Sequence, residues 1–130
     1  MITQLDHMVL TVRSIEQTVT FYTRVLGMQK EEFAGGRIAL KFGNQKFNLH
    51  EAGKEFSPRA EKPVPGSADF CLITDVPIQE AMDRVREHEV EIIDGLVDRT
   101  GANGPIKSFY FRDPDLNLVE VSSYIGMDDG

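Results

Sequence analysis

The chain has 130 residues, 41% of them hydrophobic and 27% charged, which allows one sizeable core and excludes a mainly disordered chain. Fourteen Lys and Arg against 21 Asp and Glu give a formal net charge of −7. Such a field repels phosphate backbones and anionic lipids, so we expect neither nucleic acid nor a membrane as a partner.

The first half of the chain reads as strand, helix and three strands. Residues 5–12 are rich in Val, Leu, Met and Thr, as in a strand. Ser14 is the expected N-cap of the following helix, with Gln17 completing a capping box, and Gly27 marks the helix end. Glycine-containing turns then separate three short strands, expected at residues 28–33, 37–42 and 46–51.

The second half repeats this order after a segment rich in Gly, Pro and charge at residues 53–66, which reads as a linker or long loop. We expect a strand at 68–74, a helix at 77–88, a strand at 90–97, a Gly-rich loop at 98–105, and strands at 106–111 and 118–123. A repeat of matched element order predicts two βαβββ modules that pack their sheets together.

Four ionisable side chains lie on the polar rows of these strands. Successive residues of a strand point to opposite faces, so His7, His50, Asp69 and Glu120 each oppose an apolar row suited to pack on a helix. If the four strands line a common concave surface, these side chains converge. Two imidazoles and two carboxylates suit a divalent ion such as Zn²⁺, Ni²⁺, Fe²⁺ or Mn²⁺.

Each of these residues also has an ordinary structural interpretation. A lone histidine on a half-buried strand, such as His7, is more often structural than a ligand. His50 lies at the end of a strand, where exposure to solvent would account for a histidine. Asp69 is almost as well suited to capping the turn at residues 65–67 as to binding a metal. Glu120 stands between two valines, and exposure on an open sheet face is its alternative.

Several motifs together resemble one protein family. They are LDHMVLTV at residues 5–12, the segment from Phe21 to Met28 with its FY and LGM, FGNQKFNLHE at residues 42–51, RTGA at residues 99–102 and FRDPDLNLVE at residues 111–120. With the paired βαβββ order, they resemble the vicinal oxygen chelate superfamily of glyoxalases, bleomycin-resistance proteins and extradiol dioxygenases. The resemblance covers the whole chain and points to glyoxalase-domain-containing proteins related to lactoylglutathione lyase.

The resemblance implies an α+β fold in which two βαβββ modules form a cup-shaped, partly closed mixed sheet, with helices outside and a metal at its centre. It predicts a single domain over residues 1–130, with modules at about 4–52 and 67–124 joined by the linker at 53–66. His7 matches the first ligand position and Glu120 the last. The family's fourth-strand carboxylate falls near Asn48, with His50 one inward position further along, and we favour His50 as the better ligand. Asp69 stands where many members carry His.

The resemblance implies a metal-dependent lyase or isomerase of the glyoxalase I kind. It would act on a small oxygenated metabolite through a metal-stabilised enolate, with Glu120 or Asp69 moving a proton. Ring cleavage of catechols by Fe²⁺ is one alternative, against which Asp69 counts, and a metal-free binding protein of the bleomycin-resistance type is another. The family commonly forms homodimers, so we expect a homodimer.

The chain is also expected to be cytoplasmic. Its start lacks the basic and apolar stretches of a signal peptide, and no run approaches the length of a membrane span. The single cysteine, Cys71, forms no disulfide within the chain, which fits a reducing compartment.

Overall fold

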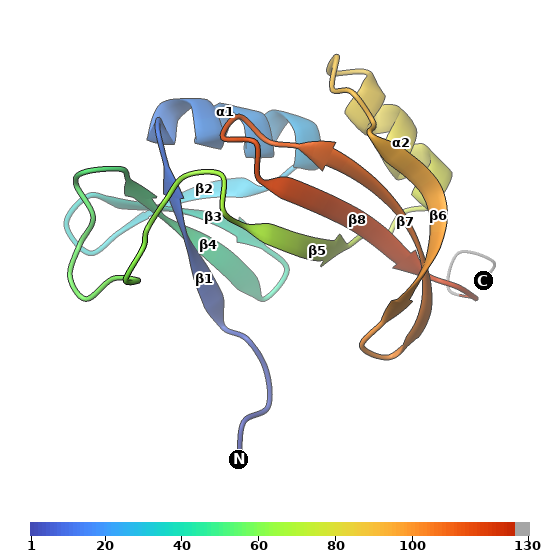
Figure 1. Cartoon of the computed structure of the whole chain (residues 1–130), viewed down its shortest axis with the longest axis horizontal. Coiled ribbons are helices and arrows are strands. Elements are labelled where there is room, and N and C mark those ends of the chain that lie inside the picture. The colour runs from blue at the N-terminus through green and yellow to red at the C-terminus, as the bar shows by residue number, and fades with distance from the viewer. Residues whose placement is uncertain (127–130) are drawn as a thin grey trace. The chain divides into compact units, whose positions relative to one another are not determined.

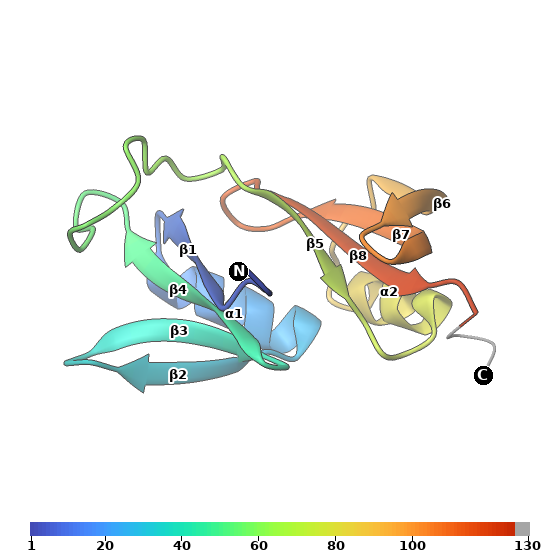
Figure 2. The same ribbon diagram turned by 90° about the horizontal axis from the view of Figure 1, so that it is seen from below.

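The computed structural model describes residues 1–126. Two compact units follow each other along the chain, unit 1 comprising Met1–Ala68 and unit 2 beginning at Asp69. Each unit has the element order βαβββ (Figures 1 and 2). The predicted α+β fold class with two βαβββ modules is therefore confirmed. The joint cup, the single domain and the module bounds stay predictions.

Unit 1 is a four-stranded mixed sheet covered on one face by a helix. Its elements are β1 (His7–Val12), α1 (Ile15–Leu26), β2 (Gln29–Phe33), β3 (Arg37–Phe42) and β4 (Gln45–Glu51). The strands lie in the order β1-β4-β3-β2, with β1 parallel to β4 and the other pairs antiparallel. Buried side chains of the helix and sheet form its core, namely Leu10, Val12, Tyr22, Leu40 and Leu49. The helix does not cover the opposite face of the sheet.

The helix of unit 1 begins and ends as predicted. The side chain of Ser14 accepts the backbone N–H of Gln17 at 3.1 Å, so one of the unpaired donors of the first turn is satisfied. Gly27 ends the helix with φ 71°, a left-handed conformation that costs glycine little. The chain is thus turned sharply into β2.

Unit 2 repeats this architecture. Its elements are β5 (Asp69–Ile73), α2 (Ile78–Arg86), β6 (Asp94–Gly101), β7 (Gly104–Arg112) and β8 (Leu118–Tyr124). The strand order is β5-β8-β7-β6, with β5 parallel to β8. Helix and sheet contribute the buried core residues Ile78, Met82, Val85, Phe109, Phe111, Val119 and Val121. Among the described residues, no helix is long and apolar enough to cross a membrane.

The Gly-rich loop predicted at residues 98–105 is wrong. Arg99 pairs with Ile106 and Gly101 with Gly104, so this segment forms the ends of β6 and β7 around a short turn. The glycine content of residues 98–105 suggests a loop, but strands pair through backbone groups, which need no particular side chain. Gly101 is required inside the hairpin for another reason, since a Cβ there would lie 2.9 Å from the hydroxyl of Tyr124.

The turn before β8 is built by one aspartate. Asp113 Oδ1 accepts the backbone N–H groups of Asp115 at 2.9 Å and Asn117 at 3.0 Å, and Oδ2 accepts the Asn117 amide at 2.8 Å. Leu116 takes φ 69° at the tip of this turn. The turn fixes where β8 starts, and hence the register of Glu120.

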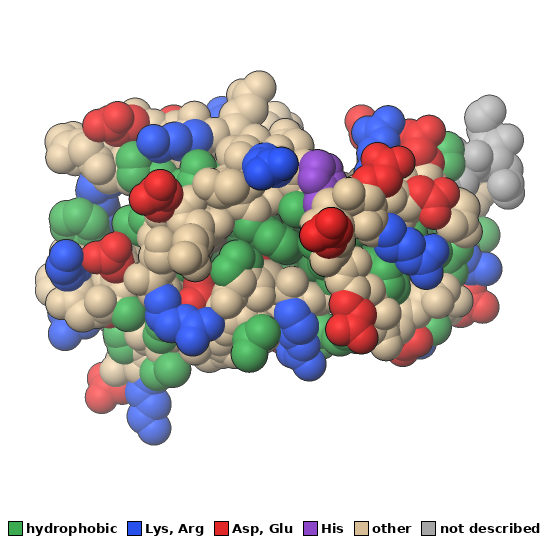
Figure 3. Space-filling model, turned by 90° about the horizontal axis from the view of Figure 1, so that it is seen from above, with side chains coloured by type: hydrophobic (Ala, Val, Ile, Leu, Met, Phe, Trp, Pro, Cys, Tyr) green, Lys and Arg blue, Asp and Glu red, His purple; other side chains and the backbone are tan. Residues whose placement is uncertain are grey.

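Charge is spread over the surface rather than gathered by sign. On the face that Figure 3 shows, acidic and basic side chains of the described residues are interspersed. The net charge of −7 therefore does not form a single acidic patch on that face.

Candidate functional site

The predicted site residues lie on the sheet faces that the helices leave open. In unit 1, His7 pairs with Lys46 and His50 with Thr11, so both histidines belong to the row opposite the core. In unit 2, Cys71 pairs with Glu120, and Asp69 lies two residues before Cys71 in the same row. Strand alternation accounts for these positions.

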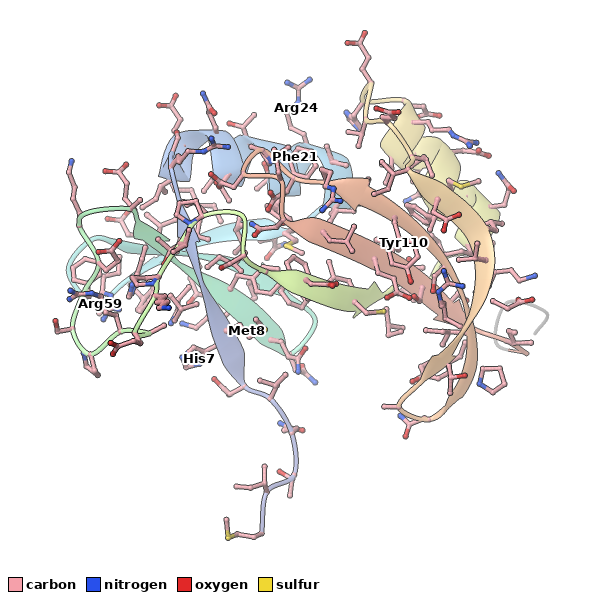
Figure 4. The ribbon with its side chains drawn as sticks, viewed as in Figure 1. His7, Met8, Phe21, Arg24, Arg59 and Tyr110 are labelled. Atoms are coloured by element: carbon pink, nitrogen blue, oxygen red, sulfur yellow. The ribbon has the colours of Figure 1, made fainter. Side chains whose placement is uncertain are left out.

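One nitrogen of the His7 ring is held by a neighbouring carboxylate. Its Nδ1 lies 2.9 Å from Asp6 Oδ2, and 42% of its side chain is exposed at the start of β1 (Figure 4). The hydrogen bond from His7 lowers the pKa of Asp6, which favours the carboxylate. A carboxylate at Nδ1 holds the ring proton there and leaves the lone pair on Nε2.

His50 is placed differently. It is 3% exposed, and the guanidinium nitrogen Nη2 of Arg37 lies 3.4 Å from its Nε2. Because a guanidinium only donates, Nε2 accepts and the ring proton stays on Nδ1, which has no partner among the described residues. Burial, followed by the charge of Arg37, lowers the pKa of His50. A cation at Nε2 disfavours a metal ion at the same atom.

The two histidines do not suit one ion. They lie four residues apart along paired strands, a separation of about 13 Å at the usual rise per residue. Asn48 lies between them in the row, is 8% exposed, and its Oδ1 has no partner among the described residues. Our preference for His50 over Asn48 as the companion of His7 therefore loses support.

Glu120 is held by two buried serine hydroxyls. Ser108 donates to Glu120 Oε2 at 2.6 Å and Ser122 donates to the same oxygen at 3.2 Å. The two serine oxygens are also 2.6 Å apart, and because each hydroxyl has one proton, the Ser122 proton is shared between Ser108 Oγ and Glu120 Oε2. Neither serine is exposed. Both contacts reach Oε2, so they fix the orientation of the carboxylate group.

A thiol and a phenol flank this carboxylate. Cys71 Sγ lies 3.1 Å from Ser122 Oγ, and burial raises the pKa of the Cys71 thiol, so the thiol stays neutral. Tyr110 pairs with Glu120 across β7 and β8 (Figure 4) and accepts a 3.1 Å hydrogen bond from Arg99 Nε. Burial likewise raises the pKa of Tyr110. Neutral hydroxyl and thiol groups thus flank Glu120, and the guanidinium of Arg99 lies one hydrogen bond further away, on Tyr110.

A pocket of about 400 Å³ opens on this face of unit 2. Its lining includes Glu120 together with Cys71, Ile73, Arg99, Ile106, Tyr124 and the hairpin residues 100–102. Most of the wall is apolar, with a few polar groups that can orient a ligand, as in small-molecule sites generally.

Asp69 lies at the exposed start of β5, diagonally across from Glu120. Within the described part of the chain, no group of three or more His, Cys, Asp or Glu side chains is arranged to hold a metal. The four-residue metal shell of His7, His50, Asp69 and Glu120 stays a prediction.

Ser108, Ser122 and Tyr124 are not singled out as site residues in the sequence analysis. All three positions follow the strand alternation that places Glu120 on the open face. A signal was therefore present, because a row that alternates with buried apolar residues contained several hydroxyls in succession.

A pocket that holds an oriented carboxylate thus lies on the open face of a βαβββ module, within an α+β fold. Residues 4–121 match the Glyoxalase/Bleomycin resistance protein/Dioxygenase superfamily. The chain belongs to this superfamily, as the resemblance predicted.

Relatives cover almost all of the chain. The glyoxalase domain-containing protein RDO1 of Mycosarcoma maydis is 52% identical over 120 residues, which span 92% of this chain and 68% of that protein. The virulence protein STM3117 of Salmonella typhimurium is 48% identical over 124 residues, spanning 95% and 86%. The solved integron cassette protein VCH_CASS1, from the mobile metagenome of V. cholerae, is 56% identical, with a TM-score of 0.94 and coverage of 95% and 97%.

Proposed function

We propose that the protein is an enzyme of this superfamily that takes a small oxygenated metabolite into the Glu120 pocket and moves a proton with that carboxylate. The reaction would be that of a lyase or isomerase of the glyoxalase I kind. The observation that carries the proposal is the pair of buried serine hydroxyls fixed on Glu120 Oε2 beside the pocket.

Proton transfer needs a base held within hydrogen-bonding reach of the reacting carbon or oxygen. Ser108 and Ser122 fix the orientation of Glu120, so Oε1 can accept a proton alpha to a carbonyl without first reorienting. Ile73 and Ile106 line the same pocket and reduce the water around the carboxylate, which strengthens its interaction with developing charge.

A divalent metal would supply Lewis-acid stabilisation of the enolate oxygen when bound. We retain His7 and Glu120 as its ligands, with Asp69, Asn48 and His50 as alternatives for the remaining positions. The Asp6 contact of His7 supports ligation through Nε2, because metal-binding histidines usually carry such a carboxylate partner. The contact of Arg37 with His50 argues against His50.

Metal content tests this ligand assignment directly. Protein reconstituted with Zn²⁺, Ni²⁺, Fe²⁺ or Mn²⁺ is expected to hold stoichiometric metal by elemental analysis, and His7→Ala and Glu120→Gln are each expected to lose most of it. His88→Ala is the matched control, because His88 is exposed after α2. If both ligand variants keep a full equivalent of metal, the assignment is wrong.

Solvent exchange tests the proton transfer. Small α-hydroxycarbonyl compounds are incubated with metal-loaded protein in D₂O, and exchange at the carbon alpha to the carbonyl is followed by NMR. Glu120→Gln is expected to slow this exchange at least 100-fold, as loss of a general base typically does. Glu91→Gln, an exposed carboxylate, is expected to leave it unchanged. Equal exchange by Glu120→Gln and the unaltered protein would refute the proposal.

Two other functions give different outcomes. Oxygen consumption with catechols after anaerobic loading with Fe²⁺ would indicate a dioxygenase. The largely apolar lining of the pocket favours, as a second candidate, a binding protein that holds its ligand without converting it. Binding that survives Glu120→Gln, with no exchange in either protein, would indicate that role. The expected homodimer is tested by sedimentation of the purified chain.

A further inference from the structure

Tyr124 lies at the far end of the pocket from Glu120. Both residues line the pocket and belong to the same row of β8, four residues apart. Their backbones are separated by about 13 Å at the usual rise of a strand. Ile73 and Ile106 line the pocket as well, and Ile106 pairs with Tyr124 in the sheet. The pocket therefore has a polar group at each end and an apolar wall.

The hydroxyl of Tyr124 is fixed in position as a hydrogen-bond donor. Its oxygen accepts the backbone N–H of Asn103 at 3.1 Å, and no acceptor for its own proton is found among the described residues. Gly101 makes room for this oxygen, because a Cβ at that position would approach it to 2.9 Å. A phenol that already accepts one bond still has its proton to donate.

The one cation in the pocket lining is already engaged. Arg99 donates through Nη1 to the Asp98 carbonyl at 2.9 Å and through Nε to Tyr110, and its Nη2 lies 3.7 Å from Asp94 Oδ2. Because Arg99 is engaged by these groups and reaches toward Tyr110 beside Glu120, it offers no free counter-charge for an anionic ligand group at Tyr124. A neutral acceptor, such as a carbonyl oxygen, suits the Tyr124 hydroxyl better.

We propose that Tyr124 determines specificity by donating a hydrogen bond to a carbonyl oxygen at the distal end of an elongated ligand. The other end of that ligand lies at Glu120, and an apolar chain lies against Ile73 and Ile106. The placement of the ligand's reacting end at Glu120 rests on the proposed function, whereas the hydrogen bond from Tyr124 does not. The ligand class is therefore a chain-like hydroxyketone with a second carbonyl remote from the first.

Two matched probes test this selectivity. 1-Hydroxyoctane-2,7-dione carries a distal carbonyl oxygen that 1-hydroxyoctan-2-one lacks, and both are titrated by NMR into the metal-loaded protein. The dione is expected to bind about five- to tenfold more tightly, the value of one hydrogen bond without charge. Tyr124→Phe is expected to remove this preference and leave the affinity for the mono-ketone unchanged.

Further variants separate a lost hydroxyl from a disturbed fold. Tyr110→Phe removes the phenol beside Glu120 and is expected to keep the preference for the dione. Gly101→Ala crowds the Tyr124 oxygen without removing it and is expected to reduce the preference. Equal binding of the two probes by the unaltered protein, or a preference that survives Tyr124→Phe, would overturn the proposal. A preference that persists while no probe exchanges its proton supports this inference and counts against the proton-transfer function.

Discussion

The hydrogen bond between Ser108 and Glu120 can be tested by Ser108→Ala. The serine is fully buried, and its hydroxyl lies 2.6 Å from both Glu120 Oε2 and Ser122 Oγ. A hydrogen bond to a charged group contributes about 1.5–3 kcal/mol, and the weaker 3.2 Å bond from Ser122 compensates in part. We expect Ser108→Ala to lower the free energy of unfolding by about 2 kcal/mol.

A double-mutant cycle isolates this pair. Urea unfolding at pH 7 of the unaltered protein, Ser108→Ala, Glu120→Gln and the double variant is expected to give a coupling energy of about 1–2 kcal/mol. Ser67→Ala is the matched control, since Ser67 is exposed and donates only to the Val64 carbonyl. A coupling below about 0.5 kcal/mol would show that the serine does not hold the carboxylate.

Two further predictions concern stability. Because burial lowers the pKa of His50 below its ordinary 6.5, unfolding takes up a proton below that pH, so the free energy of unfolding should fall as the pH drops through this range. His50→Gln should flatten that dependence in urea titrations at several pH values, and an unchanged dependence would contradict it. Gly95→Ala places a Cβ 2.6 Å from Phe109 Cβ at φ 147° and should destabilise by about 2–3 kcal/mol in thermal or urea unfolding, whereas no loss would show that β6 shifts freely.

The sequence predicts the fold correctly where capping residues and the spacing of apolar residues indicate the same element. Ser14 and Gly27 bound a helix because each satisfies or permits a backbone geometry that few other residues do. The hairpin of β6 and β7 was not readable, because its strands are paired through backbone groups and its glycine serves a close approach to Tyr124. From the sequence, such a glycine indicates only a tendency to form turns. The close packing against Tyr124 that requires it becomes visible only in the structure.

The sequence predicts where individual residues of the candidate site lie, but not which residues they contact. Strand alternation puts Glu120 and His7 on open faces, but the partners of each depend on which strands pair and in which register, and alternation alone does not give either. The pairing of β7 with β8 brings Ser108 to Glu120, and that of β3 with β4 brings Arg37 to His50. The first contact orients the carboxylate of Glu120, and the second makes Nε2 of His50 a hydrogen-bond acceptor for Arg37.

The hydroxyls around Glu120 bear on whether the pocket converts its ligand or only holds it. A partly buried carboxylate loses hydration, and hydrogen bonds from Ser108 and Ser122 only offset that loss. An apolar residue in place of Glu120, with small neighbours in place of the serines, would avoid this loss of hydration. It would also suit a mainly apolar ligand better. Two buried donors aimed at one oxygen of a pocket carboxylate, with the second oxygen not engaged by them, support the reaction proposed above. This reasoning favours proton transfer over binding alone.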